Sequence, residues 1–185
     1  MFNLNNIDAS WTLFLDRDGV INHEKKASYI FNWEEFNFYD GVKEAMNILN
    51  NRFNSIVMVT NQKGIGRQLM SVDDLDNIHT NMKSEIETHG GRVDKIYYCP
   101  DLDSHSINRK PNAGMALQAK KDFPAIDFKK SIIVGNKLSD MQFGRNAGMF
   151  TIFVATTNPE TPYPHELIDA RFNNLLHFAE ALTKA

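Results

Sequence analysis

Short runs of apolar residues alternate along this chain with segments whose apolar residues recur at helical spacing. Each run is three to five residues long and rich in β-branched or aromatic side chains, which is typical of strands buried on both faces of a sheet. We predict strands from these five runs, at residues 11–15, 56–59, 96–99, 132–134 and 151–155.

Helical patterns fill the intervals. Apolar residues at i, i+3, i+4 and i+7 predict a helix over residues 42–49, with Asp40 as its N-cap. The same spacing predicts a second helix over 75–86, and Ser71 with Asp74 forms a candidate capping box at its start. Weaker helical stretches lie near residues 113–122, 138–147 and 174–183.

The alternation of strand and helix predicts a three-layer, Rossmann-like α/β fold with a mainly parallel sheet. A chain of 185 residues with 42% hydrophobic and 23% charged residues suits one domain spanning residues 1–185. The net charge of -3 gives no basic field for nucleic acid or a membrane surface. Cys99 is the one cysteine, so no internal disulfide can form.

The first residues carry no basic stretch followed by an apolar run, so we predict no signal peptide. The sequence contains no run of 18 apolar residues, the length expected of a membrane span. These features predict a cytoplasmic protein that does not contact a membrane.

Polar residues follow directly after three of the apolar runs. In open parallel sheets the active site lies at the carboxyl ends of the strands, so these positions are candidates for chemistry. Asp16 and Asp18 follow the first run, Thr60 ends the second, and Asn136 with Asp140 follows the fourth. Two carboxylates two residues apart can divide nucleophilic attack from proton transfer and can share a divalent cation. The alternative is a turn or helix cap, at the aspartates or at Asn136.

Two further segments could contact a phosphate. Lys110, which follows Arg109 and precedes a proline, could pair with a phosphate and with a nucleophilic carboxylate, or could be a solvated surface residue. The glycines of Gly64-Ile65-Gly66 hint at a nucleotide loop, but Leu69 stands where such a loop needs its third glycine. We therefore interpret those glycines as turn formers.

In this order the polar residues resemble the four motifs of the haloacid dehalogenase superfamily of phosphohydrolases. The matching segments are Asp16-Arg17-Asp18-Gly19-Val20-Ile21-Asn22, then Thr60, Lys110, and residues 135–140. Residues 59–62, 97–100, 109–111 and 134–141 are similar, more narrowly, to the phosphatases of heptose 1,7-bisphosphate and histidinol phosphate. The resemblance covers about residues 11–156.

The resemblance implies a mechanism. Asp16 would be the nucleophile that forms an aspartyl-phosphate, and Asp18 would be the general acid and base. It also implies Mg²⁺ held by Asp16, the backbone carbonyl of Asp18, Asn136 and Asp140. The residues expected to bind phosphate and the rest of the substrate are Thr60, Asn61, Arg109 and Lys110.

Two departures from the family bear on this expectation. Asn136 stands where the family has a metal-binding carboxylate. This leaves open the alternative that catalysis is weakened and that the protein is a module that binds phosphosugars. The zinc loop of the heptose enzymes is missing, because Cys99 is followed by His105 and no further cysteine, so we expect no structural zinc.

The segment after the first motif is too short for a cap domain, so we expect a capless fold. We predict a monomer that hydrolyses a small phosphorylated sugar. The first expectation is a D-glycero-D-manno-heptose 1,7-bisphosphate 7-phosphatase, and the alternative is a histidinol-phosphate phosphatase.

Overall fold

The computed structural model describes residues 3–184, in which six parallel strands form one sheet in the order β3-β2-β1-β4-β5-β6. Thr12 of the first strand pairs with Ser55 on one side and Ser131 on the other, so that strand lies in the interior of the sheet. The strands are β1 (Thr12–Leu15), β2 (Ser55–Asn61), β3 (Lys95–Cys99), β4 (Ser131–Gly135), β5 (Phe150–Val154) and β6 (Ala170–Phe172).

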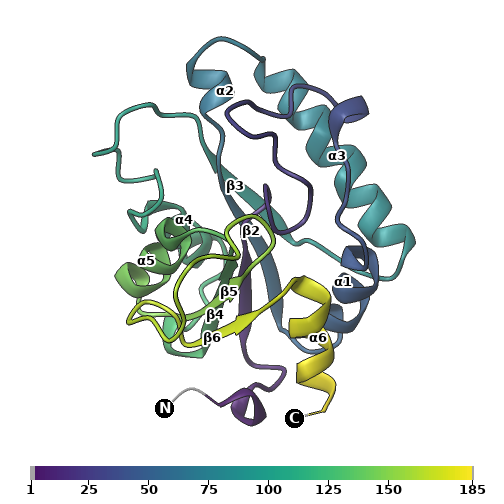
Figure 1. The fold of residues 1–185 in the computed structure, drawn as a ribbon, viewed down its shortest axis with the longest axis vertical. Coiled ribbons are helices and arrows are strands. Elements are labelled where there is room, and N and C mark those ends of the chain that lie inside the picture. Colours follow the sequence, from purple (N-terminus) through teal and green to yellow (C-terminus); the bar gives the residue numbers. More distant parts are fainter. Residues whose placement is uncertain (1–2, 185) are drawn as a thin grey trace.

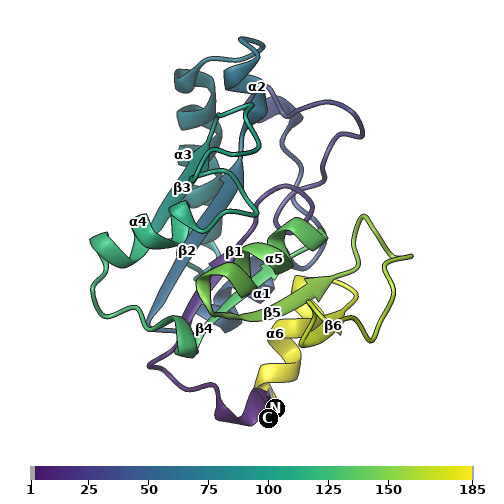
Figure 2. The same ribbon diagram turned by 90° about the vertical axis from the view of Figure 1, so that its left-hand side faces the viewer.

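Helices cover both faces of this sheet, which confirms the predicted three-layer fold. Figure 1 shows α4 and α5 on one side of the strands and α1, α3 and α6 on the other. Figure 2, turned by a quarter, shows both chain ends at the opposite end of the molecule from α2. The helices are α1 (Val42–Asn50), α2 (Lys63–Gly66), α3 (Val72–Thr88), α4 (Gly114–Asp122), α5 (Leu138–Ala147) and α6 (Leu175–Thr183).

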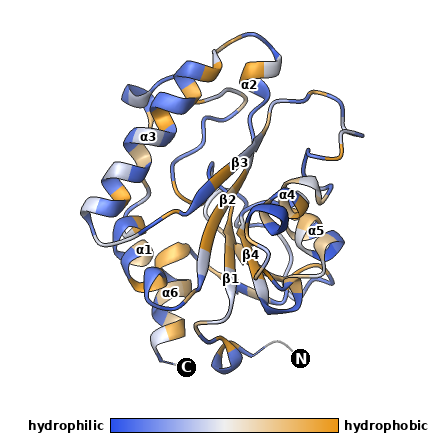
Figure 3. Ribbon diagram, turned by 180° about the vertical axis from the view of Figure 1, so that it is seen from behind, coloured by the Kyte–Doolittle hydropathy of each residue, from blue (hydrophilic) through white to orange (hydrophobic). Residues whose placement is uncertain are grey.

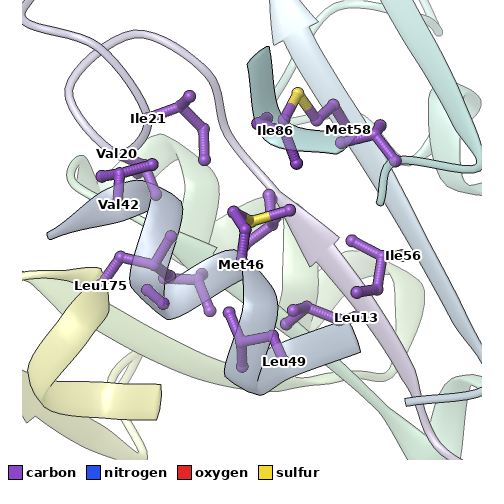
Figure 4. Packing of buried hydrophobic residues seen from close by; sticks show 14 of the residues in the cluster. Leu13, Val20, Ile21, Val42, Met46, Leu49, Ile56, Met58, Ile86 and Leu175 are labelled. Carbon is purple, nitrogen blue, oxygen red and sulfur yellow. The ribbon is translucent and has the colours of Figure 1, made fainter. Parts of the chain in front are cut away.

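The strands separate two hydrophobic cores because successive side chains point to opposite faces. Leu13 of β1 packs in the core beneath α1, α3 and α6, where Figure 4 shows it beside Met46 and Leu49 of α1. Phe14, the next residue, belongs to the core beneath α4 and α5, together with Phe143. Figure 3 shows the matching pattern, with largely apolar strands and helices that carry both polar and apolar positions.

The five predicted strands are all present, with ends shifted by at most two residues, and the capping box of Ser71 and Asp74 is confirmed. Strand β6 was not predicted, because its three residues are only half-buried and form no apolar run. The prediction of Asp40 as an N-cap is wrong. Gly41 is the N-cap, in a left-handed conformation with φ of 77°, and no side chain caps α1.

The segments that could hold a cap domain are short loops here. Between β1 and α1 the chain forms only one short 3-10 helix, Trp33–Glu35, and between β2 and α3 only the four-residue α2. The glycines interpreted as turn formers lie in this α2. Among residues 3–184 no helix has the length and apolar character needed to cross a membrane.

Candidate active site

A cleft of about 600 Å³ opens at the carboxyl ends of the central strands. It brings together residues from all four motifs identified in the sequence, as well as a loop that follows β1. The lining includes Asp16 and Asp18, residues 24–30, residues 60–63, Ser104, residues 109–111, Lys137, Ser139 and Asp140.

A buried lysine joins two of the predicted carboxylates. The Nζ atom of Lys110 lies 2.8 Å from Oδ1 of Asp16 and 2.7 Å from Oδ1 of Asp140. The second oxygen of Asp140 accepts a hydrogen bond of 3.0 Å from the backbone N–H of Lys137, at the start of α5. Asp140 therefore fixes Lys110 to the first turn of a helix, and the alternative of a solvated surface lysine is wrong.

Burial dominates the charge state of this trio. It raises the pKa of Asp16 to about 6, while Lys110 acts in the opposite direction and Asp140 adds to the rise. Burial works against the ammonium of Lys110, but the two carboxylates outweigh it and raise the pKa of the lysine. Asp16 also donates its backbone N–H to the carbonyl of Val134, so its position is tied to the neighbouring strand.

The surroundings of Asp18 shift its pKa in the opposite direction from that of Asp16. Burial would raise its pKa, but the charge of Arg17 and hydrogen bonds from Asn22, Arg17 and Gln62 outweigh it and lower the pKa. Arg17 Nη2 lies 2.9 Å from both oxygens of Asp18, Asn22 Nδ2 lies 3.0 Å from Oδ1, and Gln62 Nε2 lies 2.9 Å from Oδ2. These three donors were not predicted from the sequence, although each lies within a motif segment.

Asn136 follows β4 directly and is fully buried. Its Nδ2 donates to Thr157 Oγ1 at 2.5 Å, whereas its Oδ1 has no hydrogen-bond partner among the described residues. A buried polar atom without a partner is costly, so this oxygen suits a ligand such as a cation. The alternative of a helix cap is wrong, because Lys137 is the N-cap of α5.

Gly19 makes room for this amide. A Cβ atom at position 19 would lie 2.0 Å from Nδ2 of Asn136, and the glycine has a φ of 91°. Both the close approach and the left-handed backbone therefore require glycine here.

The predicted phosphate-binding residues take different positions. Thr60 is buried, and its hydroxyl oxygen accepts a hydrogen bond of 2.9 Å from Gln62. Asn61 exchanges two hydrogen bonds with the backbone of Lys110, at 3.0 and 3.1 Å, and so clamps the lysine loop to the end of β2. Arg109 lines the cleft and donates to the carbonyl of Asp101 at 3.1 Å.

Hydrogen bonds hold the loop that follows β3, where no structural zinc is expected from the sequence. Asn112 Nδ2 donates to the carbonyl of Ser106 at 2.9 Å, and Ser106 Oγ donates to Asp101. Cys99 is buried at the end of β3, and His105 is exposed and pairs with Asp103. Among residues 3–184 no three His, Cys, Asp or Glu side chains come close enough together to share a metal ion.

The sheet order and the aspartate pair after β1 define a phosphatase of the haloacid dehalogenase superfamily, that is, a phosphoric monoester hydrolase. More narrowly, the chain belongs to the family described as polynucleotide kinase 3 phosphatase, whose model matches residues 10–173.

Curated relatives and a solved structure agree with this assignment. A D-glycero-alpha-D-manno-heptose-1,7-bisphosphate 7-phosphatase of Campylobacter jejuni is 42% identical over 77% of this chain and 80% of its own. The corresponding beta enzyme of Escherichia coli K12 is 35% identical over 93% of each chain. The crystal structure of D,D-heptose 1,7-bisphosphate phosphatase from B. bronchiseptica, complexed with magnesium and phosphate, gives a TM-score of 0.85 at 28% identity, over 94% of this chain and 98% of that one.

Proposed function

We propose that this protein hydrolyses a phosphate ester of heptose 1,7-bisphosphate through an aspartyl-phosphate, with Mg²⁺ as cofactor. The observation that carries the proposal is the buried trio of Asp16, Lys110 and Asp140 at the base of the cleft. A carboxylate held beside an ammonium can attack phosphorus while the lysine neutralises the phosphoryl oxygens.

In the proposed reaction an oxygen of Asp16 forms a bond to phosphorus, and the bond from phosphorus to the sugar oxygen breaks. Asp18 donates a proton to that leaving oxygen, then takes a proton from the water that hydrolyses the aspartyl-phosphate. Because the free carboxyl of Asp18 has a lowered pKa, its protonation requires an anionic phosphate beside it, which raises the pKa. The hydroxyl of Thr60 would bind a phosphoryl oxygen in both steps.

The residues present fit a magnesium ion. Asp16 supplies a carboxylate, and Asn136 supplies a buried oxygen that lacks a hydrogen-bond donor among the described residues. We infer that these two, with the backbone carbonyl of Asp18, would hold the ion, and that Asp140 supports them by fixing Lys110. When bound, Mg²⁺ supplies positive charge to the phosphoryl group.

The rim of the cleft favours a substrate with a second anionic group. Five basic residues line it, in the loop after β1, in α2, in the loop before α4 and at the start of α5: Lys25, Lys26, Lys63, Arg109 and Lys137. Lys25 and Lys137 are paired with Glu35 and Glu24, which leaves three cations without an ion pair among the described residues. Burial, and then the nearby charges of Arg109, Arg67 and Lys137, lower the pKa of Lys63. A second phosphate would relieve that repulsion, and the relatives named above are bisphosphatases.

The experiment that tests this function measures phosphate release from the alpha and beta anomers of heptose 1,7-bisphosphate and from histidinol phosphate, with and without Mg²⁺. We expect a heptose bisphosphate to be the best substrate and Asp16→Asn to abolish turnover. Faster hydrolysis of histidinol phosphate would overturn the substrate assignment. Binding of heptose bisphosphate without turnover would support the alternative of a phosphosugar-binding protein. We further propose that residues 1–185 act as one domain and as a cytoplasmic monomer.

A further inference from the structure

Arg17 is almost completely buried, at 1% exposure, and each of its guanidinium nitrogens has a partner. Nε lies 3.3 Å and Nη2 2.9 Å from Oδ1 of Asp18. Nη1 lies 3.1 Å from Nε2 of His79, a residue of α3 that is 62 positions away in sequence. The face of the guanidinium lies over the ring of Phe36, with its carbon 6.0 Å from the ring centre. These contacts allow the guanidinium one orientation.

His79 occupies a position where an apolar residue is expected. It falls on the buried stripe of α3 formed by Leu75, Ile78, Met82 and Ile86, and it is 8% exposed. A guanidinium can only donate hydrogen bonds, so Nε2 of His79 must accept, and the imidazole must be neutral. Burial, and then the charge of Arg17, lower the pKa of His79 to about 3, which agrees with a neutral ring.

We propose that His79 is a positioning residue for the phosphatase reaction: it holds Arg17 so that the guanidinium presents two N–H groups to Asp18. This inference rests on the proposed function, which assigns proton transfer to Asp18. Without an acceptor at position 79, Nη1 would be a buried donor without a partner. The guanidinium would then turn toward water, and Asp18 would lose the contact that fixes its position relative to the leaving oxygen.

The test compares His79→Leu, which removes the acceptor, with His79→Gln, whose side-chain oxygen restores one. Two substrates separate proton transfer from general damage: an alkyl sugar phosphate, whose leaving oxygen needs a proton, and p-nitrophenyl phosphate, whose phenolate leaves without one. The kcat/KM value reports the half-reaction in which the ester breaks. For His79→Leu we expect kcat/KM to fall on the order of tenfold for the alkyl substrate and much less for the aryl substrate. His79→Gln should recover most of the loss.

Met82→Ala is the matched control, because Met82 lies on the same buried stripe and its side chain has no nitrogen or oxygen that could bond to Arg17. It should leave the ratio of the two kcat/KM values unchanged. Equal losses on both substrates in His79→Leu, or no rescue by His79→Gln, would overturn the positioning role. Asp18→Ala separates the two levels of the proposal. If Asp18→Ala keeps full activity on the alkyl substrate, the proposed role of Asp18 is wrong. If Asp18→Ala loses activity but His79→Leu does not, only the role of His79 is wrong.

Discussion

Replacing Asn136 with aspartate should strengthen magnesium binding and lower the free energy of unfolding of the metal-free protein. In the proposed magnesium site the amide contributes a neutral oxygen. The trio that shares this site has two carboxylates facing one ammonium, so the local charge is already negative. The substitution adds a second net negative charge in a fully buried position. The contact with Thr157 survives the change, because the threonine hydroxyl can donate to a carboxylate oxygen.

The magnitude follows from Coulomb's law. A charge pair about 4 Å apart at an effective dielectric of about 20 is worth roughly 4 kcal/mol before desolvation is subtracted. We expect a net gain of about 1.4 kcal/mol, which corresponds to magnesium binding that is on the order of tenfold tighter. Without metal, the uncompensated buried carboxylate should lower the free energy of unfolding by about 1–3 kcal/mol. For a chain of this size that is a decrease in Tm of roughly 2–4 °C per kcal/mol.

Two measurements check this prediction: a magnesium titration by calorimetry, and thermal unfolding with and without saturating magnesium. Asn77→Asp is the matched control, because it adds the same charge at an exposed position on α3, where the side-chain oxygen can still accept from Asn81. The control should change neither magnesium affinity nor the effect of magnesium on Tm. Equal magnesium affinity of Asn136→Asp and the natural protein would refute the assignment of position 136 to the metal site.

Three further predictions concern the trio, the missing zinc loop and the buried histidine. Lys110→Met leaves Asp16 and Asp140 without their cation, so unfolding in denaturant should show a loss of about 3–5 kcal/mol, together with loss of turnover. A preserved midpoint would contradict the pairing. Elemental analysis should find no stoichiometric zinc, because Cys99 has no companion thiolate, and one zinc per chain would refute this. The unfolded state binds a proton on His79 below about pH 6.5, and the folded state binds one only near pH 3. The free energy of unfolding should therefore decrease as the pH is lowered through this window, by up to about 1.4 kcal/mol per pH unit. His79→Gln should show a shallower dependence, and an identical slope would count against a buried neutral imidazole.

The strands and the meeting of the motifs were predictable because both depend on patterns along the chain. A strand buried on both faces needs a continuous apolar run, and β1, β2 and β4 have one. A parallel sheet then brings the carboxyl ends of its strands to one edge, which is why Asp16, Thr60 and Asp140 lie near one cleft.

The parts that escaped prediction depend on side-chain directions or on weak local patterns. Gln62 reaches Asp18 only because of the turn between β2 and α2, and no spacing rule encodes that turn. His79 interrupts an apolar stripe, which was a signal, but its partner Arg17 lies in a different motif and could be identified only in three dimensions. Gly41 replaced the expected cap at Asp40 because a left-handed residue, rather than a side chain, begins α1.

The two aspartates after β1 show how the fold gives neighbouring carboxyls different properties. Burial raises the pKa of Asp16, and one lysine shared with Asp140 offsets it only partly. The charge of Arg17, and then hydrogen bonds from Asn22, Arg17 and Gln62, outweigh burial and lower the pKa of Asp18. Carboxyls whose environments separate their pKa values are suited to separate roles. In the proposed reaction the proton on Asp18 therefore depends on a bound phosphate, so substrate binding must precede protonation of Asp18. Arg17, held by His79, fixes the position of Asp18, and this contact acts before any bond breaks.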